Sequence, residues 1–188
     1  GAGEISSVSG MNPNYTFGQD EYNFFTMAME QLVPDADILE ARNPDLGAGD
    51  MSSQISAVQQ QDPDVIFTSF WGGDVTTFLQ QGVNNGLFEG RTVAGTILYS
   101  AADDMSESLI NDVRDQADHV LSGSRNFYWN APDTGNWPPG TDLMSAVEGQ
   151  SDVSIPTAHY LSGYGAVTAW ATAVEKAIEV TGGYPSQE

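Results

Sequence analysis

The sequence has few basic residues and no cysteine. Only five lysines and arginines stand against 26 aspartates and glutamates in 188 residues, which gives a formal net charge of −21 at pH 7. A protein that binds nucleic acid must neutralise a run of phosphates, so this composition excludes a nucleic-acid partner. It also excludes a polybasic patch that would hold the chain on an anionic membrane. The absence of cysteine excludes disulfides, thiolate chemistry and zinc ribbons.

Long apolar runs and catalytic signatures are missing as well. No stretch of about 20 apolar residues predicts a transmembrane helix, and no segment has the layout of a signal peptide. The chain begins at Gly1, so we expect a trimmed N-terminus and a signal peptide in the full-length protein. There is no Walker loop, Gly-x-Ser-x-Gly elbow, Gly-x-Gly-x-x-Gly loop or His-Glu-x-x-His motif. His119 and His159 are predicted to begin a strand and a helix, where a structural role is expected rather than that of a general base. We therefore predict that the chain is not an enzyme.

The surplus of carboxylates predicts adaptation to high salt. At about 0.15 M salt the Debye length is roughly 8 Å, and a net charge of this size destabilises a compact chain through self-repulsion. In molar salt that length falls to about 3 Å, so the same surface becomes tolerable and stays hydrated. The loop from Asn43 to Asp50 is rich in oxygen atoms but does not match a calcium loop. No metal site and no cofactor are predicted.

Short apolar strands alternate with amphipathic helices along the first part of the chain. This alternation predicts an α/β fold with a doubly wound parallel sheet and right-handed crossovers. The predicted strands are Ile5–Ser9, Asp37–Arg42, Asp64–Phe70, Thr92–Leu98 and Val120–Ser124.

Apolar residues at helical spacing define the faces that the helices turn to the core. The first helix is predicted over residues 17–33, the second begins near Asp50 as its N-cap, the third closes at residues 84–86, and the fourth is capped by Asp103 or Asp104. The residues predicted to line these faces are Phe24, Phe25, Ala28, Met29 and Leu32; Met51, Ile55 and Val58; Val75, Phe78, Leu79 and Gly82; and Met105, Leu109, Val113 and Ala117.

The pattern changes after the segment Trp137–Gly140. Beyond it we predict only helices, a short one over Thr141–Gly149 and a long one from Tyr160 to Ile178 that ends at Gly182. These helices have no strand of their own to cover. We expect them to pack on the far side of this sheet or on a further lobe.

Candidate binding residues lie in the loops that follow three of the strands. In an open parallel sheet, ligands bind beyond the carboxyl ends of the strands. Aromatic rings there can enclose a small ligand, and adjacent glycines let backbone N–H groups approach it at the start of a helix. The alternative is that the tryptophan merely covers the sheet and the Gly-Gly-Asp stretch is only a turn and a cap. The candidates are Tyr15, Phe17, Trp71, Gly72, Gly73, Asp74, Tyr99 and Ser100.

Several motifs resemble one family, in the order in which that family has them. Tyr-Thr-Phe-Gly-Gln at residues 15–19 is similar to the Tyr-Gly signature that opens the second lobe of type I periplasmic-binding proteins. Asp-Met-Ser-Ser-Gln-Ile at residues 50–55 resembles the start of the next helix of that family. Asp-Pro-Asp-Val-Ile-Phe at residues 62–67, Phe-Leu-Gln-Gln-Gly at residues 78–82 and Gly-Tyr-Gly-Ala-Val at residues 163–167 continue the match.

The resemblance implies half of a two-lobed receptor. Residues 1–130 correspond to the second ligand-binding lobe, and residues 131–188 to a crossover with helices that return to the first lobe, whose N-terminal part is absent. The aromatic contacts of the family map onto Phe17, with Tyr15 as the nearby alternative, and onto Trp71. The carboxylate that holds an amino acid's ammonium in the family maps near Ile97, which cannot do so. Either Asp74 or Asp103 replaces it, or the ligand is not a simple α-amino acid.

The resemblance also implies a function. Such receptors capture a small polar solute, such as a branched-chain amino acid or an amide, by closure of two lobes, and deliver it to the membrane permease of an ABC transporter. We expect hinges near the chain start and near residues 125–138. We also expect an extracytoplasmic, membrane-anchored protein from a halophilic archaeon. The alternatives are a sensory ligand-binding domain of the same fold and a flavodoxin-like enzyme, for which residues 12–15 form a poor phosphate loop.

Overall fold

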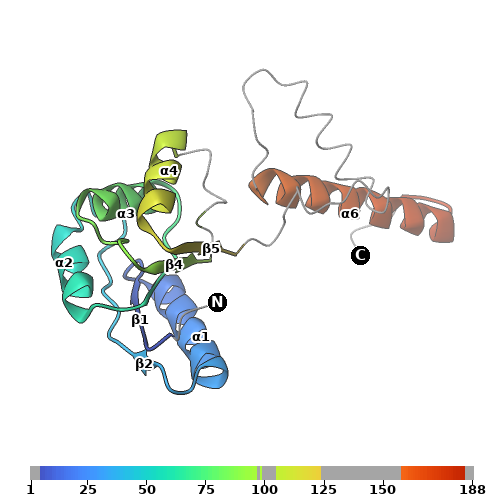
Figure 1. Cartoon of the computed structure of the whole chain (residues 1–188). Coiled ribbons are helices and arrows are strands. Elements are labelled where there is room, and N and C mark those ends of the chain that lie inside the picture. Colours follow the sequence, from blue (N-terminus) through green and yellow to red (C-terminus); the bar gives the residue numbers. More distant parts are fainter. Residues whose placement is uncertain (1–4, 97, 99–104, 124–157, 185–188) are drawn as a thin grey trace. The chain divides into compact units, whose positions relative to one another are not determined.

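The computed structural model of the chain describes residues 5–96, 98, 105–123 and 158–184. The chain divides into two compact units, Gly1–Ser124 and Arg125–Glu188. In the described residues, the first unit contains the strands and the helices α1–α4, and the second contains the helix α6 (Figure 1). The predicted short helix over residues 141–149 and the segment Trp137–Gly140 lie outside the described residues, as do residues 125–138, where a hinge is expected.

The first unit is built on a parallel sheet of five strands in the order β2-β1-β3-β4-β5 (Figure 1). Every pairing between neighbouring strands is parallel, so the predicted parallel α/β sheet is confirmed. The predicted strand over residues 37–42 is reduced to two residues, followed by a single bridge between Met11 and Arg42. The strands are β1 (Ser7–Met11), β2 (Asp37–Ile38), β3 (Val65–Thr68), β4 (Thr92–Gly95) and β5 (His119–Ser122).

Helices cover both faces of the sheet, as a doubly wound fold requires. On one face, α2 (Ser52–Gln61), α3 (Gly73–Asn84) and α4 (Glu107–Gln116) form the larger apolar core with Ile66 and Val93 of the sheet. On the other face, α1 (Thr16–Leu32) forms a smaller core through Met29, with Val8 and Val65. Adjacent strand residues point to opposite faces, which explains why neighbours such as Val65 and Ile66 belong to different cores.

The predicted core faces of α2, α3 and α4 are confirmed. Each residue predicted to face inward from these helices is buried, and so are Met51 before α2 and Met105 before α4. The prediction that Asp50 is the N-cap of α2 is wrong by one residue, because the N-cap is Met51. The Asp50 carboxylate still accepts hydrogen bonds from the backbone N–H of Ser52 at 2.9 Å and from its hydroxyl at 2.6 Å. The prediction that Asp103 or Asp104 caps α4 is wrong. The helix begins at Glu107, so the preceding residue, Ser106, caps it by accepting from the N–H of Leu109 at 3.2 Å.

Helix α1 turns a narrower stripe to the sheet than the sequence predicts. Phe25 is half-buried and Met29 is buried, as predicted. The prediction that Phe24, Ala28 and Leu32 face the core is wrong, because Phe24 is 68% exposed, Leu32 is 78% exposed and Ala28 is also exposed.

The reason lies in the aromatic contacts between α1 and β3. The ring of Phe25 stacks on Phe67 of β3 with centroids 4.3 Å apart, and Tyr22 packs on the same ring at 6.3 Å. The sheet-facing stripe therefore runs through Tyr22, Phe25 and Met29, at steps of three and four. Phe24 is one residue away from this stripe, and one residue turns the side chain by about 100° in a helix with 3.6 residues per turn.

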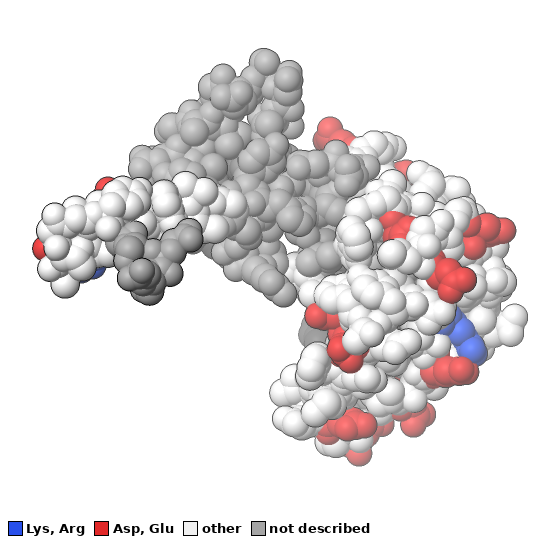
Figure 2. Space-filling view, turned by 180° about the vertical axis from the view of Figure 1, so that it is seen from behind, with Lys and Arg blue, Asp and Glu red and all other residues white. Residues whose placement is uncertain are grey.

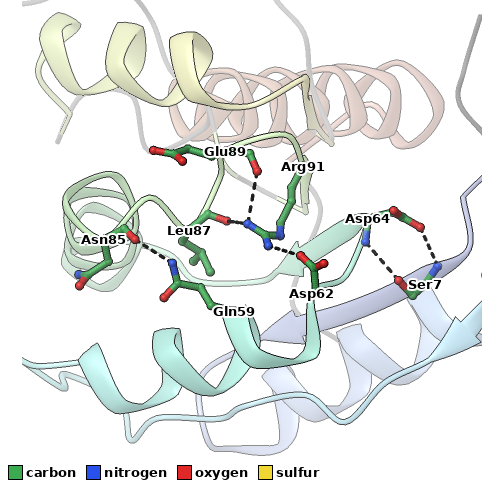
Figure 3. Close-up of polar contacts among 8 residues, drawn as sticks. All are labelled: Ser7, Gln59, Asp62, Asp64, Asn85, Leu87, Glu89 and Arg91. Carbon is green, nitrogen blue, oxygen red and sulfur yellow. Dashed lines mark hydrogen bonds and ion pairs between the residues drawn. The ribbon is translucent and has the colours of Figure 1, made fainter.

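A polar network joins the amino ends of β1, β3 and β4 (Figure 3). The Arg91 guanidinium donates to the backbone carbonyls of Leu87 and Glu89 at 3.1 and 3.3 Å and to the Asp62 carboxylate at 2.5 Å. The Asp64 carboxylate accepts from the N–H of Ser7 at 3.0 Å. This network fixes the turn between α3 and β4 at the edge of the sheet that lies opposite to the candidate binding loops.

The acidic residues are spread over the first unit. On the face shown in Figure 2, carboxylates lie scattered across the surface and basic groups occupy far less of it. The ion pairs within the described residues are Arg42–Glu40 at 2.9 Å and Arg91–Asp62 at 2.5 Å. Most carboxylates of this part of the chain are therefore held apart from basic groups.

In the described part of the second unit, α6 (Ala158–Thr181) runs as one long helix. It ends, as predicted, at Gly182, whose φ of 71° lies in the left-handed region. Its charged residues are Glu175, Lys176 and Glu179, and large apolar side chains such as Trp170 are exposed. A helix that is apolar around its circumference is typical of a buried position. Nevertheless, no helix in the described residues combines the length and the hydropathy needed to cross a membrane.

Candidate functional site

Two loops meet at the carboxyl edge of the sheet, beyond β1 and β3. The last residues of these strands, Met11 and Thr68, are paired in the sheet register. The residues that follow them, Asn12 and Ser69, are fully buried, and the Ser69 hydroxyl donates to the Asn12 side-chain oxygen at 2.8 Å. The Asn12 side-chain nitrogen has no hydrogen-bond partner within the described residues. This buried pair fixes the direction in which both loops leave the sheet.

The same two loops bring three of the predicted aromatic residues together. The Trp71 indole N–H donates to the Tyr15 hydroxyl at 2.9 Å. The Tyr15 ring lies against that of Phe17, with centroids 5.9 Å apart and planes inclined by 30°. Trp71 is 46% exposed, and Tyr15 and Phe17 are half-buried. We call Tyr15, Phe17 and Trp71 the aromatic rim. Tyr99 and Ser100, the candidates after β4, lie outside the described residues.

Backbone is accessible next to the rim, at the start of α3. Gly72 precedes the helix with φ 56° and ψ −139°, a conformation that glycine adopts far more readily than other residues. A Cβ atom placed on Gly72 or Gly73 would meet no other atom within 4 Å. The first N–H groups of a helix have no partner within the helix and suit an anionic or acceptor group. The structure thus leaves space for a ligand group beside the backbone N–H donors at Gly72 and Gly73, as the sequence predicts.

Asp74 does not cap α3, which was the alternative to a role in binding. Gly72, not Asp74, is the N-cap of α3, and the Asp74 carboxylate accepts from the backbone N–H of Gly47 at 3.0 Å. In the same loop, Asp45 accepts from the side-chain amide of Asn14 at 3.0 Å. The loop Asn43–Asp50 is therefore tied to both rim loops. Its Leu46, which the sequence interpretation overlooked, is 55% exposed. The position of this loop after a strand of a parallel sheet could have indicated it.

A further carboxylate, also overlooked in the sequence, reaches the carboxyl end of β4. The Thr96 hydroxyl, just beyond β4, donates to the Glu21 carboxylate at 2.8 Å, and both residues are half-buried. Glu21 lies on α1, four residues after Phe17. Neither of the ion pairs of the described part involves Glu21. Ile97 and Asp103, considered in the sequence for a carboxylate site, lie outside the described residues.

Two titratable groups of the described residues, Tyr22 and Asp50, have shifted pKa values. Burial raises the pKa of the Tyr22 hydroxyl to about 12, and this hydroxyl donates to the carbonyl of Leu39 at 2.8 Å. Hydrogen bonds from Ser52 lower the pKa of the exposed Asp50 carboxyl. His119 begins β5 and therefore lies at the opposite edge of the sheet from the rim. No cluster of three or more metal-binding side chains occurs within the described residues.

Comparison with known proteins gives one family match. The family model described as periplasmic binding protein matches residues 2–188, which is almost the whole chain. No sequence among the curated proteins matches significantly.

Solved structures similar to this chain have the same fold at low sequence identity. A solute-binding protein of an ABC transporter from R. palustris, in complex with 4-hydroxybenzoate, is 20% identical with a TM-score of 0.68, over 95% of this chain and 45% of its own. A leucine-binding protein from Thermotoga maritima is 18% identical with a TM-score of 0.69, over 92% and 45%. An amino acid ABC transporter substrate-binding protein from Pseudomonas fluorescens is 17% identical with a TM-score of 0.68, over 96% and 44%. The chain thus spans less than half the length of each.

Proposed function

Because this chain belongs to the periplasmic binding protein family, we propose that it forms one wall of a solute-binding cleft in a receptor of an ABC-type uptake system. The observation that carries the proposal is the aromatic rim of Tyr15, Phe17 and Trp71. The rim lies at the carboxyl edge of an open parallel sheet, where folds of this kind bind small ligands. A binding wall needs no general base or nucleophile, so the receptor is not an enzyme.

The aromatic rim and the start of α3 would contact different parts of the solute. The hydrogen bond between the Trp71 indole and the Tyr15 hydroxyl holds the tryptophan ring in place while 46% of the residue stays exposed. A ring fixed in advance loses little conformational entropy when it covers the apolar part of a solute. The open backbone beside Gly72 and Gly73 then receives a carboxylate or another hydrogen-bond acceptor of the same solute.

The cleft needs a second wall. The similar solved proteins are more than twice as long as this chain. We propose that residues 1–130 form the second lobe of the receptor and that residues 131–188 form the crossover and the helices that return to the first lobe. The apolar circumference of α6 supports this assignment, because such a helix requires cover on several sides. The solute is then captured when the two lobes close around it.

The proposed ligand is a small polar solute such as a branched-chain amino acid or an amide. The proposed partner is the membrane permease of the transporter. We further propose that the receptor lies outside the cytoplasm and is anchored to the cell surface. The abundance of carboxylates on the chain suits a halophilic setting, since molar salt screens their mutual repulsion.

A binding assay on the full-length protein tests this function. Isothermal titration calorimetry in 3 M KCl would use leucine, isoleucine, valine, urea and 4-hydroxybenzoate as ligands. We expect at least one to bind. We expect Trp71→Ala to weaken that binding by at least about tenfold, because truncating an aromatic residue at the centre of a contact commonly costs 2 kcal/mol or more.

The matched control is Phe24→Ala. Phe24 is also an exposed aromatic residue of the first unit, at 68% exposure, but it lies on the outer side of α1. Its replacement should leave the dissociation constant unchanged. Equal effects of the two substitutions, or no binding of any ligand in the panel, would contradict the proposed site.

A further inference from the structure

We propose that Leu46 is a specificity-determining residue of this wall, which covers the far end of a solute's apolar part. The inference rests on the proposed function and adds to it the residue that selects a solute by the length of that part. Leu46 lies in the loop Asn43–Asp50, which follows β2, and it is 55% exposed. This loop is separate from the aromatic rim and from the backbone at the start of α3, so its contact with a solute is an additional one.

The loop leaves the sheet beside the rim. Strand β2 is the neighbour of β1, and β1 is the neighbour of β3. Because these strands are parallel, the loops that follow them leave the sheet at the same carboxyl edge. Ligands bind at this edge where the connections of neighbouring strands turn to opposite faces, which here is between β1 and β3. The loop after β2 therefore borders the proposed binding space on one side.

Two hydrogen bonds hold the loop beside the proposed solute site. The Asn14 side-chain amide, in the loop that carries the rim tyrosine, donates to the Asp45 carboxylate at 3.0 Å. The backbone N–H of Gly47 donates to the Asp74 carboxylate, in the first turn of α3, at 3.0 Å. The residues before and after Leu46 are thus bonded to the two segments that form the site.

A tight turn presents Leu46 to solvent. The carbonyl of Asp45 accepts from the N–H of Ala48 at 3.1 Å, and Gly47 has a φ of 76°, as the third residue of a type II turn does. Leu46 is the second residue of this turn. Gln81 of α3 donates to a further carbonyl of the same loop at 2.9 Å. A side chain on a turn held in this way covers a solute at little cost in conformational entropy.

An exposed leucine at this edge gives the wall a second apolar group. In the described part of the first unit, Leu46 and Trp71 are the exposed large apolar residues in loops at the carboxyl edge. The rim lies over β1 and β3, near the middle of the sheet, whereas Leu46 lies toward β2. A short solute therefore contacts the rim alone, and a longer one reaches Leu46 as well.

The experiment compares solutes of increasing length on the full-length protein in 3 M KCl. One series is L-alanine, L-norvaline and L-norleucine, and the other is acetamide, butyramide and hexanamide, so that only methylene groups are added within each series. Calorimetry measures the dissociation constants for the wild type and for Leu46→Ala. Leu32→Ala is the matched control, because Leu32 is a leucine with 78% exposure at the end of α1, and so at the amino edge of the sheet.

We expect the wild type to bind the longest member of at least one series more tightly than the shortest, by roughly fourfold for each methylene that is covered. Leu46→Ala should reduce this preference by about tenfold, mainly by weakening the binding of the longest member. Leu46→Met conserves most of the volume and should restore the preference. Leu32→Ala should leave it unchanged. Melting temperatures in the same buffer verify that all variants fold.

Asp74 provides a second test, as a positioning residue that acts through the turn. Asp74→Ala removes the acceptor of the Gly47 N–H and should lower the same preference several-fold. Asp74→Asn keeps an oxygen that accepts from Gly47 and should lower it less. A residue that only stabilised α3 would change the melting temperature and leave the preference for length as it is.

The failure of this assignment differs from the failure of the receptor function. If the wild type binds these solutes without a preference for length, or if Leu46→Ala keeps the preference, Leu46 does not cover the solute, while the receptor function stands. The same holds if Leu46→Ala weakens all members of a series equally, which would indicate a contact with the opposing lobe instead. If no solute of either series binds, the receptor function fails for these solutes and the assignment of Leu46 fails with it.

Discussion

Replacement of Arg91 by alanine tests how much the hydrogen bonds of its guanidinium to the backbone stabilise the fold. The Arg91 side chain is only 14% exposed, whereas its partner in the ion pair, Asp62, is 84% exposed. The guanidinium also donates to the backbone carbonyls of Leu87 and Glu89 (Figure 3). These two bonds hold the turn that leads from α3 into β4.

The magnitudes of these contributions differ. An exposed ion pair is worth about 0–1 kcal/mol, and molar salt screens it further. A hydrogen bond from a charged donor is worth about 1.5–3 kcal/mol, and water offsets part of that when the donor is removed. We therefore expect Arg91→Ala to lower the free energy of unfolding by about 2–4 kcal/mol. Asp62→Asn should change it by less than about 0.5 kcal/mol, because Asn also tolerates the left-handed conformation of this residue, φ 50°.

The assay is urea unfolding in 2 M KCl, followed by far-UV circular dichroism, with the midpoints compared at constant slope. Arg114→Ala is the matched control. Arg114 is exposed in the last turn of α4, where a cation contributes a few tenths of a kcal/mol that salt largely screens. The reasoning would be refuted if Asp62→Asn cost as much as Arg91→Ala, or if Arg91→Ala and Arg114→Ala had the same midpoint.

Three further predictions concern stability. Gly82→Ala should destabilise the fold by about 1–3 kcal/mol in urea unfolding, despite the better helix propensity of alanine, because the new Cβ would lie 2.3 Å from the buried ring of Phe88; an unchanged or raised midpoint would show that the ring moves aside. The melting temperature should rise between 0.1 M and 3 M KCl, because salt screens the net charge of −21, and an unchanged value would contradict the halophilic interpretation. Burial raises the pKa of the Tyr22 hydroxyl from 10.0 to about 12. The folded state therefore holds the hydroxyl proton more tightly than the unfolded state does. The stability that follows from this difference is fully present below pH 10 and is lost as the pH rises to 12. Tyr22→Phe should lose less stability than the wild type over that interval, and parallel losses in both would be evidence against this assignment.

The sequence predicted the elements of the fold better than their limits. Each strand followed by a helix was recognisable because buried strands are short and apolar and helices repeat with a period near 3.6. The observed bounds of a strand or helix differ from the predicted ones where long-range contacts determine them. The second strand retains only Asp37 and Ile38, and α4 begins after Ser106 rather than at the acidic pair before it. A local pattern cannot report how far an edge strand stays paired.

Part of the candidate site could be predicted from the sequence. The rule that ligands bind beyond the carboxyl ends of parallel strands pointed to the loops that carry Tyr15, Phe17, Trp71 and Tyr99. The structure brings the first three together, and Tyr99 lies outside the described residues. Their role in binding stays a prediction. Asp74 was also singled out, but its bond to Gly47 depends on a loop that the sequence places nearly 30 residues away.

What the sequence determined by itself was the fold class, the charge and the identity of the rings that follow the strands, because these depend on composition and on short periods. Tertiary structure alone decided which side of α1 is covered, that Asp45 and Gly47 bond to Asn14 and Asp74, and that Glu21 reaches Thr96. The physical reason is that such contacts join segments from different strands and helices. Their geometry follows from the order and register of the sheet, which no local pattern of residues encodes.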